Sequence, residues 1–294
     1  MPASHVPIRA MTRLLAEMQT NIMACALPLF DGRVDRFMIF SLLNRRQADG
    51  GRPLPVLAAA ESLGLPFETT RRHIAEMIDI GLCRRDRGGI MSQVSFDDES
   101  WSALFIEAHD SLVRFVEDMR AIDALPCFPS SARSYDWNHG LAATADLMLA
   151  VADGNQGTHH DRLDLVVFST VMAASQRRVT IDLALSRQHR MIAAPPPSHL
   201  VRPVRARRVA DALGLSEATV RRRVDRLIEG PLEVVDGGLI PRETWISSAP
   251  AQLVSLNSYL NISRLMRGLA AHGFSFEQPS AAYRGGRPAY VRFD

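Results

Sequence analysis

Lysine is absent from this sequence. All 34 positively charged residues are arginine, set against 32 acidic residues, so the formal net charge is only +2. The absence excludes a Walker A phosphate loop, which requires a lysine. Every cationic side chain is instead a planar guanidinium that can bind a phosphate or a guanine with two hydrogen bonds. Because the overall charge is near zero, only a local concentration of arginine can indicate a nucleic-acid partner.

Cysteine is also scarce. The three cysteines, Cys25, Cys83 and Cys127, are widely spaced and share no ligand spacing with the histidines. This pattern argues against a disulfide framework and a zinc finger, so we interpret the cysteines as small buried side chains. The run His-His-Asp at 159–161 has no second pair of ligands and is interpreted as a polar loop. We therefore expect no metal site and no cofactor.

Long hydrophobic runs and the usual enzyme motifs are missing as well. No apolar stretch approaches the roughly 18 residues of a membrane-spanning helix, and the first residues lack the apolar core of a secretory signal. The patterns Gly-x-Gly-x-x-Gly, Gly-x-Ser-x-Gly and His-Glu-x-x-His do not occur. We expect a protein that is not an enzyme, has no membrane partner and is located in the cytoplasm, associated with the nucleoid.

What the sequence does contain is an internal repeat. A length of 294 residues predicts about two domains, and 47% hydrophobic residues are enough to form their cores. Shifting the numbering by 150 aligns Ser-Leu-Gly-Leu at 62–65 with Ala-Leu-Gly-Leu at 212–215. The same shift joins Thr69 to Thr219, Arg71 to Arg221 and Arg72 to Arg222. At other offsets, Phe40 matches Phe168, with a longer insert in the second copy, and Trp101 matches Trp245. The repeat indicates a duplicated domain, because solenoid periods are about 20–50 residues.

Residues 212–232 of the second copy have the pattern of a helix-turn-helix. A short helix ends at Gly214, a three-residue turn follows, and Ser216 can cap the next helix. One stripe of that helix is apolar and consists of Val220, Val224, Leu227 and Ile228. At about 100° per residue, the opposite face carries Ala218, Thr219, Arg222 and Arg226, flanked by Arg221 and Arg223.

Each helix-turn-helix lies within a longer pattern of helices and a hairpin. Hydrophobic periodicity predicts helices at 9–27, 34–46, 54–63, 67–80, 99–124, 140–152, 161–175, 204–213, 217–229 and 250–271. Turns that contain glycine predict a β-hairpin, or wing, at 82–92 and at 232–240. We expect a mainly α fold with small β-wings, arranged as tandem duplicated winged-helix domains with long flanking helices. The expected parts are a first domain at 1–129 (helix-turn-helix 54–80), a second at 130–276 (helix-turn-helix 204–229) and a basic flexible tail at 277–294.

The segment Ala212–Leu227 resembles the helix-turn-helix of bacterial winged-helix regulators of the Lrp/AsnC and IclR types. Each whole copy, with a leading and a long trailing helix around the wing, resembles the MarR-type regulators. This resemblance implies binding to double-stranded DNA, and it allows for a homodimer and for a small-molecule effector between the leading and trailing helices. MarR-type proteins normally carry one domain per chain and form homodimers. We therefore expect the two copies to form a pseudo-dimer with recognition helices about one DNA turn, roughly 34 Å, apart.

Arginine is concentrated on the second helix-turn-helix, where residues 202–226 contain eight arginines and three acidic residues. We predict that base edges are contacted by Thr219, Arg222 and Arg226. We predict that phosphates are contacted by Arg205, Arg207 and Arg208 on the first helix of the motif and by Arg221 and Arg223 on the second. Ser216, which caps the second helix, is a further candidate for DNA contact. Contacts to phosphate would make binding strongly dependent on salt.

The first helix-turn-helix is less basic, because Glu68 and Glu76 share its outer face. Its predicted base contacts are Thr69, Arg71 and Arg72, assisted by Arg84, Arg85 and Arg87 on the wing. The alternative use of this face is dimerisation or partner binding. In the tail, Arg-Gly-Gly-Arg-Pro resembles the AT-hook core with one extra glycine, so Arg284 and Arg287 are candidates for minor-groove contact.

These patterns lead to one main hypothesis, a sequence-specific transcription regulator that uses its two winged-helix domains as a pseudo-dimer. Two alternatives stay open. The acidic first recognition face and the acidic second wing, with Glu233 and Asp236, are compatible with a protein-interaction scaffold. A replication-initiator-like, origin-binding protein is the other alternative, since plasmid initiators also carry two winged helices.

Overall fold

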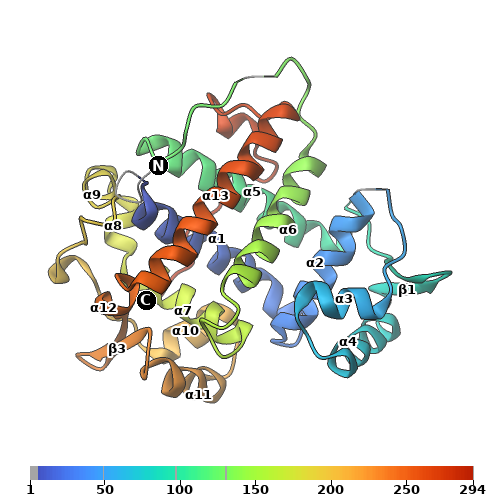
Figure 1. Ribbon diagram of the computed structural model, residues 1–294, viewed down its shortest axis with the longest axis horizontal. Helices are drawn as coiled ribbons and strands as arrows, with labels where there is room; N and C mark the ends of the chain where they lie inside the picture. Colours follow the sequence, from blue (N-terminus) through green and yellow to red (C-terminus); the bar gives the residue numbers. More distant parts are fainter. Residues whose placement is uncertain (1–5, 49, 97, 130, 294) are drawn as a thin grey trace.

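The computed structural model describes residues 6–48, 50–96, 98–129 and 131–293, which form a mainly helical fold with two small antiparallel sheets (Figure 1). The helices of the first half are α1 (Ile8–Leu29), α2 (Val34–Ala48), α3 (Val56–Leu63), α4 (Phe67–Asp79) and α5 (Glu99–Ala121). Those of the second half are α6 (Trp137–Gly154), α7 (Arg162–Ser175), α8 (Arg177–Ile181), α9 (Leu183–Gln188), η2 (Ser198–Leu200), α10 (Ala206–Leu213), α11 (Glu217–Leu227), α12 (Glu243–Ile246), α13 (Ala249–Ala271) and η3 (Pro279–Ala282). The predicted fold class, mainly α with small β-wings, is confirmed. None of the helices in these ranges combines the length and the hydrophobicity needed to cross a membrane.

A β-hairpin follows each helix-turn-helix. Strand β1 (Cys83–Asp86) pairs antiparallel with β2 (Gly89–Ser92), and β3 (Leu232–Val235) pairs with β4 (Gly238–Pro241). In both halves, a residue just before the first helix of the motif adds a one-residue bridge to the hairpin. These bridges are Leu54 to Ile90 and Val204 to Leu239. We call residues 54–92 the first unit and residues 204–241 the second unit.

The turns of the two units have the same backbone geometry. Gly64 and Gly214 follow α3 and α10 with φ angles of 58° and 63°, the left-handed conformation that glycine adopts without strain. The next residue in each turn donates its backbone N–H to a carbonyl five residues earlier. These bonds run from Leu65 to Ala60 at 2.9 Å and from Leu215 to Ala210 at 3.0 Å. The turn chemistry therefore explains why both helix pairs have the same bend.

The leading helix of each copy crosses to the other copy. Helix α1 packs against α7 and α10 as well as α5, and α6 packs against α2 as well as α13. At the end of α1, Pro28 faces Gly214, so closely that a Cβ on this glycine would meet the proline ring at 3.0 Å. At the end of α6, Gln156 faces Gly64 in the same way. This mutual exchange gives the two copies one continuous hydrophobic core.

Equivalent aromatic clusters occupy the two halves. Trp101 packs on Phe40 with ring centroids 5.2 Å apart, and Trp245 packs on Phe168 at 5.3 Å. The third ring of the first cluster is Phe30, which contacts both partners. The corresponding third ring in the second cluster is a histidine, described next. The matched tryptophans therefore have the same packing role.

His159 replaces a phenylalanine in the second cluster, with its ring centroid 5.2 Å from Phe168 and 5.7 Å from Trp245. Neither ring nitrogen of His159 has a hydrogen-bond partner in the described part of the chain. Burial lowers the pKa of His159 to about 4, with the nearby Asp164 and Asp161 acting in the opposite direction. The imidazole is therefore a neutral ring in an aromatic environment, and its two nitrogens are buried without hydrogen bonds to offset their loss of hydration.

Replacing His159 by phenylalanine is expected to raise the free energy of unfolding by about 1 kcal/mol at pH 7, since unsatisfied buried nitrogens are removed. A histidine whose pKa is lowered on folding contributes its full stability above its ordinary pKa of about 6.5 and loses it as the pH falls toward 4. The variant should therefore lose less stability than the wild type between pH 6.5 and pH 4.5. Urea unfolding across this range measures both effects. The reciprocal variant Phe30→His is the matched control and should lose stability with a new acid dependence; an H159F protein with the wild-type pH profile would contradict the prediction.

Some predicted boundaries differ from the observed ones. Helix α1 continues through Pro28 instead of ending before it, because a proline in the last turn costs only one backbone hydrogen bond. Helix α6 begins at Trp137, before the predicted start at 140, because Asp136 accepts a hydrogen bond from the Asn138 N–H at 2.9 Å and caps the helix. The insert between α7 and the second unit contains the short helices α8 and α9.

The tail, predicted to be flexible, packs on the body of the protein, and this corrects the prediction. Asp110 of α5 accepts a hydrogen bond from the backbone N–H of Arg284 at 2.9 Å. The ring of Tyr290 lies between the guanidinium groups of Arg114 and Arg177, 4.4 Å and 4.6 Å from its centroid. Cation–π contacts and buried backbone bonds, neither of which has a local sequence signal, hold this segment in place.

Candidate nucleic-acid interface

The second unit presents exposed arginines at the start of α10, along it and on the neighbouring α11. They are the N-cap Arg205, then Arg207, Arg208, Arg221 and Arg222. On α10, the side chain of Arg207 is 73% exposed, and the carboxylate of Asp211 approaches Arg207 and Arg208 only to 3.9 Å. Such loose, solvated ion pairs contribute little and are readily exchanged for another anion. Helix α10 therefore presents cationic groups that are available to phosphate.

The start of α11 has the predicted cap. Ser216 Oγ accepts a hydrogen bond from the Thr219 N–H at 3.2 Å, and the two hydroxyl oxygens lie 2.8 Å apart. One turn further along, Arg221 forms an exposed ion pair with Glu217 at 2.7 Å. Arg222 is exposed and, alone among the α11 arginines, has no hydrogen bond or ion pair within the described ranges. All the N–H donors of its guanidinium group are therefore available to a ligand.

Arg223 and Arg226 have partners within the fold. Both side chains turn toward the start of α7, where Asp161 is the N-cap and Asp164 lies in the first turn. Asp164 is only 1% exposed and accepts a hydrogen bond from Arg226 at 2.8 Å, while Arg223 binds Asp161. A buried carboxylate needs a cationic partner. That Arg226 contacts bases and Arg223 contacts phosphate stays a prediction, and both guanidinium groups have carboxylate partners in the fold, with the Arg226 side chain still 36% exposed.

The first half has the same ion pair with the charges reversed. There Arg36 of α2 binds Glu76 of α4, as Asp164 of α7 binds Arg226 of α11. Arg36 and Asp164 each stand four residues before one of the matched phenylalanines, and Glu76 and Arg226 are related by the shift of 150. The contact that holds the second helix of each unit has therefore been kept while its polarity changed. Glu76, which the sequence placed on the outer face, is turned toward α2.

On the first unit, the exposed face of α4 is mixed in charge. Arg71 forms an exposed ion pair with Glu68 at 2.7 Å, and Thr69 is half-buried. Arg72, the equivalent of Arg222, is exposed and has no hydrogen bond or ion pair in the described part of the chain. The structure therefore brings one unpaired arginine to the same position on each of the two second helices.

The hairpin and outer face of the first unit add basic and apolar side chains. The exposed arginines of the hairpin are Arg84, Arg85 and Arg87. Arg84 is paired with Asp86 at 3.0 Å. Leu57 is 54% exposed and Phe67 is 43% exposed, at positions that the shift of 150 matches to Arg207 and Glu217. The first unit therefore presents apolar groups where the second presents charge.

The two tail arginines lie inside intramolecular contacts. Arg287 forms ion pairs with Glu117 and Asp118 of α5. The guanidinium carbon of Arg284 lies 5.0 Å from the centroid of the Trp137 ring. The prediction that Arg284 and Arg287 contact a minor groove stays a prediction, and in this structure residues of α5 and α6 are partners of both side chains.

The two units lie on the same side of the molecule. In Figure 1, α4 and α11 are at the lower edge of the view, and the long helices α1, α5, α6 and α13 lie above them. Arg162 of α7 joins the halves by donating to Asp35 of α2 at 2.9 Å and to the carbonyl of Leu63 at the end of α3. The shared core and this bridge fix the position of one unit relative to the other.

The residues that sequence reasoning missed are the acidic partners. Asp161 and Asp164 occupy the cap and the first turn of a predicted helix, where acidic residues are common in any helix. Nothing in that local pattern distinguishes a simple cap from a carboxylate pair that binds two arginines of α11. Arg162 carries no local signal at all.

Comparison with models of protein families, with curated proteins and with solved structures finds no match to this chain. The described ranges contain no group of three or more His, Cys, Asp or Glu side chains placed to hold a metal ion.

Proposed function

We propose that this protein binds double-stranded DNA at specific sequences through its two units and regulates transcription at the nucleoid. The observation that carries the proposal is the pair Arg72 and Arg222. These two exposed arginines without partners stand at the same position of the second helix in two structurally equivalent helix-turn-helix units. A guanidinium at such a position can contact the O6 and N7 of guanine together.

The contacts are unequal between the units. The second unit supplies phosphate contacts through Arg205, Arg207 and Arg208, whose exposed side chains neighbour the helix that contacts bases. The first unit supplies Arg72 and the basic hairpin. Because the units differ in sequence, the two half-sites of the target differ as well.

Salt dependence tests the proposal directly. A duplex selected from a genomic library should bind the wild type with an affinity that falls steeply as salt rises. The triple variant Arg205→Ala, Arg207→Ala, Arg208→Ala should reduce the slope of log affinity against log salt by about 2.7, since each lost phosphate contact removes about 0.9. Fluorescence anisotropy at several salt concentrations measures this slope.

A matched control replaces two exposed arginines of the long helices, Arg120→Ala and Arg267→Ala, and should leave the slope unchanged. A wild-type protein with no affinity for any duplex at low salt would refute the DNA-binding proposal. Selection of repeated origin sequences instead of promoter sites would favour a replication-initiator role for the same interface.

A second candidate function is favoured by the exposed Leu57 and Phe67. Apolar side chains on an outer helical face are typical of a protein contact, so the first unit is a candidate docking surface for a protein partner. Under this alternative Arg72→Ala leaves DNA affinity unchanged, while Leu57→Ser with Phe67→Ser abolishes a stoichiometric complex.

A further inference from the structure

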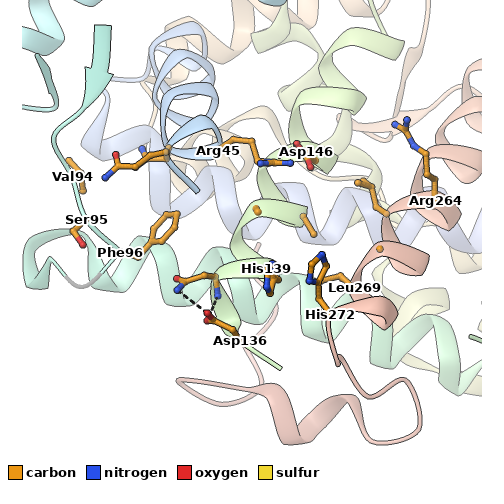
Figure 2. A pocket seen from close by; sticks show the side chains of 17 residues that line it. Arg45, Val94, Ser95, Phe96, Asp136, His139, Asp146, Arg264, Leu269 and His272 are labelled. Atoms are coloured by element: carbon orange, nitrogen blue, oxygen red, sulfur yellow. Dashed lines mark hydrogen bonds and ion pairs between the residues drawn. The ribbon is translucent and has the colours of Figure 1, made fainter. Parts of the chain in front are cut away.

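A cavity lies away from α4 and α11, between the end of α2 with the segment that follows the first hairpin and the flanking helices α6 and α13 of the second copy. It has a volume of about 580 Å³, within the range of small-molecule sites. Its walls are the end of α2, residues 94–96 after the first hairpin, the first half of α6 and the last part of α13 (Figure 2).

The floor of the cavity is open because small residues face each other on two helices. Arg264 and Gly268 of α13 and its C-cap His272 follow one another at intervals of four residues, and a Cβ at Gly268 would have no neighbour within 4 Å. On α6, Ala142 and Ala143 lie between the cavity-lining His139 and Asp146. Because no large side chain occupies the middle, the space between the polar groups at the ends is free.

Two imidazoles meet at one end of this space. The rings of His139 and His272 are stacked with centroids 3.8 Å apart, and Figure 2 shows them side by side beside Leu269. Neither ring has a carboxylate partner within the described ranges, and Arg264 approaches only the amide oxygen of Asn261, at 3.5 Å. Desolvation, together with the charges of His139 and Arg133, lowers the pKa of His272. Two stacked imidazoles repel one another when both are protonated, so an anion beside them is stabilising.

The acidic side chains of the cavity are already occupied. Asp146 forms an ion pair with Arg45 at 2.7 Å. Asp136 caps α6 and accepts hydrogen bonds from the Asn138 backbone at 2.9 Å and from its side chain at 3.4 Å. In the described lining, His139, His272 and Arg264 therefore have no carboxylate partner. The two carboxylates, Asp136 and Asp146, already accept hydrogen bonds from other residues.

We propose that this cavity binds a small phosphorylated molecule through His139, His272 and Arg264. A tetrahedral phosphate accepts hydrogen bonds from several directions and suits the two imidazoles at one end of the space, while Arg264, about two helical turns before His272, supplies cationic charge from the other end. The apolar wall of Phe96, Leu265 and Leu269 receives the body of a phosphomonoester. The proposal is independent of DNA binding, and the experiment below uses no DNA.

Binding is linked to protons. A phosphate anion stabilises a protonated imidazole beside it, so binding takes up protons and affinity increases as the pH falls from 8. Below the second pKa of phosphate, about 6, the ligand loses charge, so affinity reaches its maximum near pH 6 to 6.5. The other charged groups around the rings are Arg133, Asp136, Arg264 and the Arg45–Asp146 pair.

The experiment titrates the full chain with inorganic phosphate and with adenosine 5′-monophosphate at pH 6.3 and pH 8, following the histidine C2–H signals by NMR and the heat by calorimetry. We expect saturable binding that is at least tenfold tighter at pH 6.3. His272→Ala and Arg264→Ala should each abolish it, and Arg267→Ala, an exposed neighbour outside the cavity, should leave it unchanged.

A second variant keeps all the charges and fills the space. Gly268→Met places a side chain in the open floor and improves helix propensity, so the protein should fold and fail to bind phosphate. The proposal is overturned if neither inorganic phosphate nor adenosine 5′-monophosphate binds at pH 6.3. It is also overturned if the Gly268→Met protein binds as tightly as the wild type, or if malonate binds more tightly than phosphate.

Discussion

Replacing Arg222 by alanine is expected to weaken binding of the selected duplex about 10- to 100-fold and to relax discrimination at one base pair. The reason is the loss of a two-bond contact to a base edge, by an arginine that has no competing partner in the described fold. Competition anisotropy against a set of single-base-pair variants of the duplex measures affinity and discrimination together. Arg222→Lys keeps the charge but not the fork, so it should retain the salt slope and lose the discrimination.

The neighbouring arginines of α11 provide the control for this prediction. Arg226 is held by Asp164, so Arg226→Ala should change duplex affinity much less than Arg222→Ala does, while lowering thermal stability. Arg72→Ala reports on the equivalent position in the first unit and should affect a different base pair. A duplex affinity that depends on Arg226 and is indifferent to Arg222 would show that the assigned face is wrong.

The second large effect is expected at Arg177, where replacement by leucine should lower the free energy of unfolding by about 3–5 kcal/mol. Glu17 of α1 is buried and accepts two hydrogen bonds from the Arg177 guanidinium, at 2.6 Å and 2.8 Å. Arg177 also donates to the carbonyl of Val291 at 2.9 Å and stacks on Tyr290. Its loss leaves a buried carboxylate without its main partner and removes an anchor of the tail. Denaturant unfolding measures the loss, and Arg178→Leu is the exposed neighbouring control.

The pH dependence of this variant follows from Glu17. Burial raises the pKa of Glu17, and Arg177 opposes that rise, so the variant has an even higher pKa at this group. A carboxyl whose pKa is raised on folding contributes its full stability below its unfolded pKa of about 4.5 and loses it as the pH rises through the folded value. The free energy of unfolding of the Arg177→Leu protein should therefore differ more from that of the wild type at pH 8 than at pH 5. Replacing Glu17 and Arg177 together by leucine should recover most of the loss, and an equal loss at both pH values would contradict the role given to Glu17.

The local features of the fold were predictable because they depend on short-range chemistry. Gly64, Gly214 and Ser216 specify turns and a cap through the conformations and hydrogen bonds of a few neighbouring residues. The hairpins follow from glycine turns between apolar residues in the same way. The shift of 150 located the equivalent positions Arg72 and Arg222 without any knowledge of their surroundings.

The remaining features depend on contacts between distant residues. Arg226 and Asp164 are 62 residues apart, and a helical wheel assigns Arg226 to the outer face because it cannot show that α7 lies beside it. The tail has the composition of a flexible segment, but Asp110 and Arg114 of α5 hold it through its backbone. The cavity beside His139 and His272 combines residues from both halves, so no single stretch of sequence indicates it.

The reversed ion pair shows what encoding both halves in one chain permits. In a homodimer every mutation appears twice, so an exchange of Arg36 and Glu76 for opposite charges would have to work in both subunits at once. Here the contact is Arg36–Glu76 in one half and Asp164–Arg226 in the other. Each half can therefore change without its counterpart, while the crossed helices α1 and α6 join the two halves in one core. The single chain therefore combines two halves that have the same arrangement of helices and hairpins and carry opposite charges at this contact.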